Sequence, residues 1–214
     1  MRQIIHSSVK SLADLELDAA WCINLKRRKD RRKKAEAEIV KLGIDVQIVD
    51  AVDADRLSLQ SAKDFTAGMV GCYLSHIMLL KMALIAGYDR ILIMEDDCTL
   101  ITGGNALLGM ALPVLPNDWQ FAWLGYTVVE SERKRTKVVN DFWCVPGGSW
   151  GTQCYMINGR DAIRKLLDGL ATMNLQIDIQ LSHHVLPRSG LKYYGITPSC
   201  MRQNFNMGSD VQTK

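Results

Sequence analysis

The chain has 214 residues, of which 48% are hydrophobic and 23% charged, and its formal net charge is +3. This length suits one well-buried domain, the small net charge argues against a nucleic-acid partner held by a broadly basic surface, and no apolar run approaches the roughly 20 residues that span a bilayer. Because residues 1–17 lack the apolar core of a secretory signal and the six cysteines show no CxxC or zinc spacing, we expect a cytoplasmic protein with reduced thiols.

The first elements of the chain predict a strand–helix–strand unit. Residues 1–18 form a lead-in segment of weak pattern, and residues 20–25 have the composition of a buried strand. Residues 29–42 predict a helix that ends at Gly43, and residues 46–49 predict a second strand. A unit of this kind implies a right-handed crossover and parallel neighbouring strands.

The rest of the chain continues to alternate helices and strands. The clearest helix covers residues 69–86, where apolar side chains recur at helical period, and an apolar strand follows at residues 90–94. Further helices are predicted at 105–112, 159–170 and 178–186, and further strands at 119–124, 138–144, 152–157 and 192–197. This alternation predicts an α/β fold in which helices flank a mixed sheet, in a single domain at residues 19–214.

Three consecutive carboxylates, Glu95, Asp96 and Asp97, follow the apolar strand at residues 90–94. Open α/β sheets bind ligands outside the carboxyl ends of their strands. Crowded carboxylates repel one another unless a cation lies between them, and Mg²⁺ and Mn²⁺ commonly bridge carboxylates to substrate phosphates. The triplet therefore predicts a metal-assisted site of exposed strand-end acids, although a strand that runs into an acidic turn explains the same letters.

A basic run at residues 26–34 follows the first strand and opens the first helix. Arginine side chains match the geometry of phosphate oxygens, so Arg31 in particular is a candidate for contacting a diphosphate. Most of the run is equally well explained as a solvated face, or as a patch for peripheral contact with an anionic membrane, such as the inner face of a cell membrane.

Three weaker signals accompany the acids. Ser75 and His76 lie on the helix at residues 69–86, where a lone histidine is more often packed than functional. The glycine-rich turn at residues 146–152 matches neither the dinucleotide fingerprint nor the P-loop, but its glycines allow a backbone to approach a ligand closely. Asp178 begins a predicted helix, either as a first-turn acid or as a general base at the edge of a cleft.

Together these motifs resemble those of glycosyltransferase family 25, the lipopolysaccharide and collagen-type galactosyltransferases. The resemblance covers residues 20–205 in matching order and spacing. It rests on the motifs Ile23-Asn24-Leu25, Asp30-Arg31-Arg32, Gly71 to His76, Ile93 to Asp97, Gly151 to Ile157 and Ile177-Asp178. It implies a GT-A-like (Rossmann-like) fold, with a nucleotide-sugar-binding half at residues 19–100 and an acceptor half at residues 101–214.

The resemblance also implies an activity, the transfer of a hexose (galactose or glucose) from a UDP-sugar to a hydroxyl of a glycan, glycolipid or protein, with inversion. Asp97 and Glu95 would bind Mn²⁺ or Mg²⁺, which neutralises the departing UDP, and Asp178 would deprotonate the acceptor hydroxyl. The residues implied in donor binding are Asn24, Leu25, Arg31, Asp50, Ala51, Asp53, Ser75, His76, Glu95, Asp96 and Gly151.

One feature departs from the pattern, and two alternatives stay open. Many GT-A enzymes place a histidine metal ligand after the last strand, whereas residues 198–214 contain none, and Gln203 is the polar residue nearest that place. The first alternative is a metal-dependent nuclease or phosphoryl-transfer enzyme that uses the same acids. The second is a non-catalytic domain that binds a nucleotide-sugar. No motif identifies the sugar or the acceptor.

Overall fold

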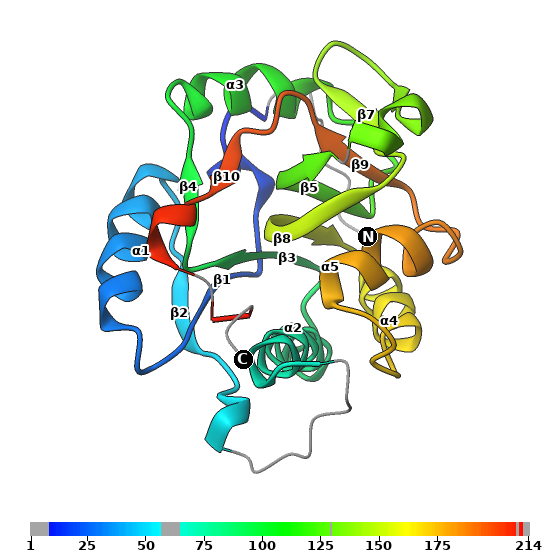
Figure 1. Cartoon of the computed structure of the whole chain (residues 1–214). Helices are drawn as coiled ribbons and strands as arrows, with labels where there is room; N and C mark the ends of the chain where they lie inside the picture. Colours follow the sequence, from blue (N-terminus) through cyan, green and yellow to red (C-terminus); the bar gives the residue numbers. More distant parts are fainter. Residues whose placement is uncertain (1–8, 57–64, 129, 209, 212–214) are drawn as a thin grey trace.

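A computed structural model describes residues 9–56, 65–128, 130–208 and 210–211 (Figure 1). It confirms the predicted α/β fold with a mixed sheet. The strands are β1 Ala19–Asn24, β2 Gln47–Asp50, β3 Arg90–Glu95, β4 Cys98–Leu100, β5 Phe121–Val128, β6 Lys137–Val138, β7 Trp143–Val145, β8 Ser149–Asn158, β9 Tyr193–Ile196 and β10 Met201–Gln203. The helices are α1 Lys29–Lys41, α2 Ala67–Ala86, α3 Gly104–Ala111, α4 Arg160–Gly169 and α5 Ile177–Ile179, and the shorter turns are η2 Leu12–Leu15, η3 Ala54–Arg56, η4 Leu112–Val114, η5 Glu130–Arg135, η6 Gln180–Val185 and η7 Phe205–Met207.

The sheet has the order β2-β1-β3-β8-β5-β9-β7-β6. β1 is parallel to both β2 and β3, which confirms the predicted strand–helix–strand unit. β8 runs antiparallel between β3 and β5, so β8 begins at the edge where β1, β2, β3 and β5 end. That edge therefore collects the residues that follow these four parallel strands and those that open β8.

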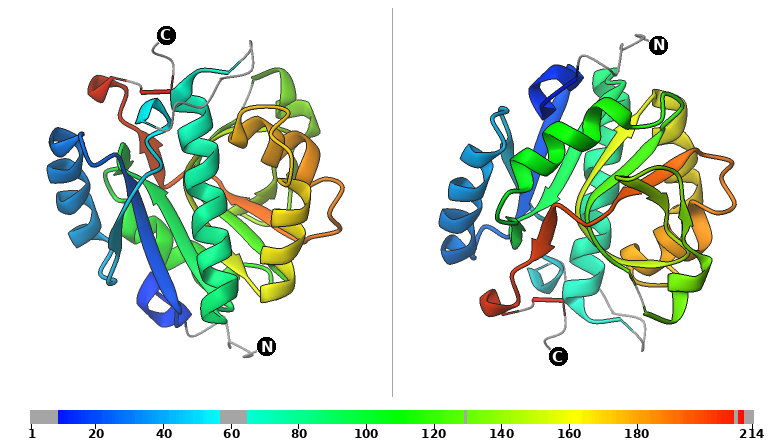
Figure 2. Two further views of the ribbon diagram at one scale, coloured as in Figure 1. Left: turned by 90° about the horizontal axis from the view of Figure 1, so that it is seen from below. Right: turned by 90° about the horizontal axis from the view of Figure 1, so that it is seen from above.

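Alternation along the central strands builds two hydrophobic cores, one on each face of the sheet. Residues such as Cys22, Leu92 and Met94 pack under α1 and α3, whereas Ile23, Ile91 and Ile93 pack under α2 and α4. Figure 2 shows α2 crossing one face of the sheet and α3 lying on the other.

α2 is the longest described helix and the most apolar. Among the described residues it is the helix whose length and mean hydropathy, 1.7, would allow it to cross a membrane. Here it packs as a core helix, because Tyr73, Leu79, Leu80 and Ala83 are buried in the second core. It begins at Ala67, two residues before the predicted start, and the hydroxyl of Thr66 caps it by accepting a hydrogen bond from the backbone N–H of Met69 at 3.1 Å.

The structure differs from the predicted elements at several places, and the single strand expected at residues 138–144 is an antiparallel pair, β6 and β7. Two three-residue strands, β4 and β10, were not predicted, and they pair with each other in antiparallel register. The predicted helix at 178–186 consists of the short α5 followed by the π-helical turn η6, a widened geometry that is frequent near functional sites. β5 spans Phe121–Val128 instead of residues 119–124, because its last residues pair with the start of β8.

Candidate functional site

The carboxyl ends of β1, β2 and β3 meet at a pocket. Asn24 lies opposite Asp50 in the β1–β2 register, and Glu95 lies opposite Ile23 in the β1–β3 register. The pocket is open to solvent, and the space between its walls, open solvent included, is about 650 Å³. The predicted site residues that line it are Leu25, Arg31, Ala51, Asp53, Ser75, His76, Glu95, Asp96 and Asp97.

Asp96 is buried and bonded on both oxygens. Nη1 of Arg31 donates to its Oδ1 at 2.8 Å, and Nδ2 of Asn24 donates to its Oδ2 at 2.7 Å. Burial raises the pKa of the Asp96 carboxyl, although the charge of Arg31 opposes this. Asp96 therefore ties α1 to β1 and holds the guanidinium of Arg31 at the pocket, which leaves it little capacity to bind a ligand itself.

Asp97 keeps one oxygen available. Nε2 of Gln203 donates to its Oδ2 at 3.1 Å, and Nη1 of Arg31 lies 3.5 Å from the same oxygen. Its Oδ1 is buried and has no hydrogen-bond partner among the described residues. Burial and the neighbouring charge of Glu95 raise the pKa of Asp97 to about 7. The expectation of exposed strand-end acids is wrong for Asp96 and Asp97, which are 6% and 4% exposed.

Glu95 is held by groups from α2 and β8. The hydroxyl of Thr152 donates to its Oε1 at 2.5 Å, and Nε2 of His76 lies 3.5 Å from the same oxygen. The other ring nitrogen of His76 hydrogen-bonds to the hydroxyl of Tyr155 at 2.8 Å. Burial raises the pKa of Glu95, but the interactions with His76 and Thr152 outweigh burial and lower it. Glu95 therefore favours the charged form, in contrast to Asp97.

These residues fit a divalent cation. A buried carboxylate oxygen of Asp97 and the buried Nε2 of His76 both lack a hydrogen-bond partner among the described residues, and the charged Glu95 lies beside them. The ligand atoms of Cys72, His76 and Glu95 lie within 4.8 Å of one another. Burial raises the pKa of the Cys72 thiol well above its ordinary value, so the sulfur is held protonated. A cation held by carboxylate oxygens of Glu95 and Asp97 would be Mn²⁺ or Mg²⁺ rather than a softer ion.

Asp178 lies in the first turn of α5, beside the glycine-rich turn. Its Oδ2 accepts a hydrogen bond from the backbone N–H of Gly151 at 2.9 Å, and its Oδ1 accepts one from Ile179 at 2.8 Å. Asp178 and Gly151 line a second pocket, which shares Cys72, Glu95, Gln203 and Val211 with the first. The structure thus brings Asp178 to the same cavity system as the acids of β3.

The remaining predicted donor residues differ in their placement. Oγ of Ser75 accepts from the backbone N–H of Val52 at 2.8 Å, so Ser75 braces the loop that carries Ala51. Asn24 is buried beneath Asp96 and does not line either pocket. Asp50 is exposed, and its Oδ2 lies 3.7 Å from Nζ of Lys26. It is also not among the residues that line the first pocket.

The arginines of the basic run point to acids. Nη1 of Arg27 lies 2.6 Å from Oδ1 of Asp53, and Arg28 forms two hydrogen bonds with Asp30. With Arg31 on Asp96, these pairs leave the expected membrane contact through residues 26–34 without support. Sequence reasoning also missed several residues of the site, namely Thr152, Tyr155, Asp210 and Val211.

The raised pKa of Asp97 predicts how the free energy of unfolding changes with pH. The change is opposite in sign to that caused by a carboxylate whose pKa is lowered by an ion pair. Its pKa in the folded protein, about 7, lies above the ordinary value of 3.8, so the folded state binds the extra proton between these values. Without metal, this contribution to the free energy of unfolding is fully present below the ordinary pKa of 3.8. It is lost as pH rises through the pKa of the folded protein, about 7. Urea titrations in EDTA should show Asp97→Asn gaining about 1–3 kcal/mol over the wild type between pH 5 and pH 8. A constant difference would contradict the raised pKa.

The mixed sheet with its flanking helices is of the GT-A-like fold class. A solved glycosyltransferase involved in the glycosylation of the major capsid of PBCV-1 matches with a TM-score of 0.52 over 86% of this chain and 92% of its own, at 7% identity, so this likeness concerns the fold alone. The chain belongs to glycosyltransferase family 25 (LPS biosynthesis protein), whose family model matches residues 18–181.

Relatives in this family carry different descriptions. The chain is 30% identical to procollagen galactosyltransferase 1-B of Xenopus laevis, over 72% of this chain and 28% of the relative. It is 27% identical to inactive glycosyltransferase 25 family member 3 of Homo sapiens, over 74% of this chain and 30% of the relative. The chain thus spans less than a third of the length of these relatives, and its activity has to be argued from the site.

Proposed function

We propose that this chain transfers a hexose, galactose or glucose, from a UDP-sugar to a hydroxyl of a glycan, glycolipid or protein, with inversion and with Mn²⁺ or Mg²⁺ at Glu95 and Asp97. The observation that carries the proposal is the buried Oδ1 of Asp97, which lacks a described partner beside Glu95 in a cavity that continues to Asp178. Family membership and relatives described as galactosyltransferases support a transferase.

On the donor side, Glu95 and Asp97 hold the cation and Arg31 adds a second positive charge at the diphosphate. When bound, the metal supplies charge that stabilises UDP as a leaving group. Asp96 fixes the position of Arg31 through its hydrogen bond at 2.8 Å. Leu25 and Ala51 provide an apolar wall for the nucleoside, and both line the pocket.

On the acceptor side, Asp178 acts as the general base. Its carboxylate is oriented by the backbone N–H groups of Gly151 and Ile179. The acceptor hydroxyl gives its proton to Asp178 and its oxygen forms a bond to the anomeric carbon. The bond from that carbon to the diphosphate oxygen breaks, and its electron pair leaves with UDP. Attack from the face opposite UDP inverts the anomeric centre.

Ligand-induced stabilisation tests the donor site. UDP with Mn²⁺ at a hundredfold excess over Kd should stabilise the folded protein by about 2.7 kcal/mol, because it binds only the folded state. Thermal melts with UDP and Mn²⁺, with either component alone and with ADP and Mn²⁺ measure this. Release of UDP from UDP-galactose and UDP-glucose, with and without a panel of glycan acceptors, then measures turnover. An absent shift with UDP and Mn²⁺ would remove the proposal.

The two alternatives give different results in the same assays. A nuclease needs a basic channel that follows the nucleic-acid backbone, whereas Arg27, Arg28 and Arg31 converge on a single carboxylate, that of Asp210, so single-stranded DNA should give no thermal shift. A non-catalytic domain would bind UDP without turnover, and a relative described as inactive favours testing this outcome. Release of UDP that requires Asp178 would exclude it.

A further inference from the structure

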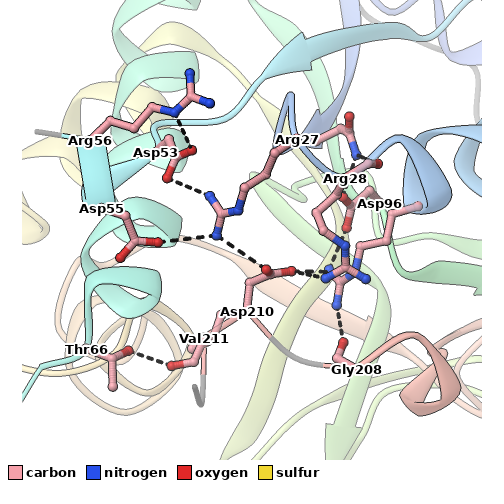
Figure 3. Close-up of polar contacts among 12 residues, drawn as sticks. Arg27, Arg28, Asp53, Asp55, Arg56, Thr66, Asp96, Gly208, Asp210 and Val211 are labelled. Carbon is pink, nitrogen blue, oxygen red and sulfur yellow. Dashed lines mark hydrogen bonds and ion pairs between the residues drawn. The ribbon is translucent and has the colours of Figure 1, made fainter. Parts of the chain in front are cut away.

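The last described residues of the chain cross the pocket proposed for the donor. Asp210 and Val211 are among its lining residues, and Val211 also lines the pocket of Asp178. Figure 3 shows Asp210 between Arg27 and Arg28, with Val211 next to Thr66. Asp210 and Val211 therefore lie where a nucleotide-sugar would have to enter.

The carboxylate of Asp210 is surrounded by arginines. Its Oδ1 lies 3.4 Å from Nη2 of Arg27, its Oδ2 pairs with Nη1 of Arg28, and Nε of Arg31 lies 3.8 Å from the same oxygen. The Asp210 side chain is 18% exposed and the Arg31 side chain 8%, so the interaction between these two is weakly screened by solvent. The three guanidinium groups converge from the first strand end and the start of α1 on one anionic group.

This arrangement suits a larger anion better than it suits one carboxylate. Guanidinium groups bind phosphate oxygens in a bidentate manner, and a diphosphate offers more oxygens and more charge than Asp210 does. Arg27 and Arg28 also keep contacts with Asp53 and Asp30, so they stay in place if Asp210 leaves. The arginines form a preorganised anion site, and Asp210 is its occupant in this structure.

Hydrogen bonds of Gly208 and Val211 contribute to holding the segment of Asp210 in place. The hydroxyl of Thr66 donates to the backbone carbonyl of Val211 at 2.6 Å, and Nη2 of Arg31 donates to the carbonyl of Gly208. The backbone of Asp210 also lies against Gly68, where a Cβ would overlap its carbonyl group. A methyl group at position 68 would thus displace the segment without removing a charge.

We propose that Arg27, Arg28 and Arg31 form the subsite for the diphosphate of the donor, and that Asp210 occupies it as an internal competitor until the donor binds. This inference rests on the proposed function, and it adds Arg27 and Arg28 to the donor site. Donor binding then moves Gly208, Asp210 and Val211 away from the pocket. Because only the fraction of molecules with an open subsite binds, the apparent Kd for UDP is the intrinsic Kd divided by that open fraction.

Isothermal titration of UDP in saturating Mn²⁺ tests the inference. Asp210→Asn, which removes the charge and keeps the shape, should bind UDP about three- to tenfold more tightly than the wild type. Gly68→Ala should shift affinity in the same direction. Arg28→Gln should weaken binding in the wild type and in Asp210→Asn alike. Arg32→Gln is the matched control, because Arg32 is half exposed and pairs with Glu36, and it should change nothing.

The outcomes separate this inference from the proposed function. If the wild type does not bind UDP with Mn²⁺, the proposed function fails, and sodium pyrophosphate without metal still tests the anion site through its competition with Asp210. If the wild type binds UDP and Asp210→Asn binds it equally or more weakly, the inference is overturned while the proposed function stands. If Arg28→Gln and Arg32→Gln weakened UDP binding equally, the inference would also be overturned, because the loss of affinity would then come from the change in net charge.

Discussion

Replacing Asp97 with alanine should lower kcat/KM for the UDP-sugar by about a thousandfold, a loss of about 4 kcal/mol of transition-state stabilisation. The reason is its Oδ1, a buried oxygen without a described partner, on a residue that lines the pocket together with Glu95. The same substitution should weaken the binding of UDP with Mn²⁺ much more than that of UDP alone. Titration measures the Kd for UDP with and without Mn²⁺, and UDP release measures kcat/KM.

The stability of this variant distinguishes a metal ligand from a residue that only supports the fold. Burial raises the pKa of Asp97, so removing its carboxyl should leave the metal-free protein at least as stable near pH 8. Asp161→Ala is a matched control, because Asp161 is an exposed acid that pairs with Lys165 on α4 at 3.1 Å. Transfer that persists in Asp97→Ala, or that is unaffected by EDTA, would contradict the metal site.

The acid triplet shows how far a motif predicts a site. An apolar strand that ends in three carboxylates predicted that β3 would deliver Glu95, Asp96 and Asp97 to the carboxyl edge of the sheet, and the structure places them there. The motif did not predict the different hydrogen bonding of these carboxylates. Asp96 accepts from Arg31 and Asn24, whereas Asp97 keeps a buried oxygen with no described partner, and that difference arises only when β1, α1 and β10 come together.

Gln203 illustrates a contact that depends on tertiary pairing. The strands β4 and β10 are three residues long, too short for alternation to predict them. Their antiparallel register places Gln203 opposite Cys98, and the backbone N–H of Asn204 donates to the carbonyl of Asp97 at 2.8 Å. The side chain of Gln203 thereby reaches Asp97. The sequence identified Gln203 as the polar residue nearest the place of the missing histidine. It could not show that the Gln203 side chain contacts the carboxylate of Asp97.

The supporting residues on β8 were predictable in part. The strand itself was expected at residues 152–157, and alternation places Thr152 and Tyr155 on different faces of a regular strand. Both nevertheless reach the Glu95–His76 pair, Thr152 directly and Tyr155 through His76. No signal in the sequence indicated Asp210, because an isolated acid among small polar residues has no pattern of its own.

Replacing Asp178 with asparagine should lower kcat by about a hundred- to ten-thousandfold, the usual contribution of a general base. An amide cannot accept the proton of the acceptor hydroxyl at this position. The affinity for UDP with Mn²⁺ should stay within about twofold, because Asp178 lines the second pocket and not the first. Single-turnover measurements with an identified acceptor, together with UDP titrations, separate the two effects.

Asp178 also has a structural role, and the experiment has to distinguish it from a catalytic one. Its two oxygens accept from Gly151 and Ile179, so the asparagine variant loses one acceptor and should lose some stability as well. A purely structural role would weaken UDP binding and turnover together, and activity would recover on cooling. A catalytic role lowers kcat alone at every temperature. Asp168→Asn, an exposed acid at the end of α4, should show neither change.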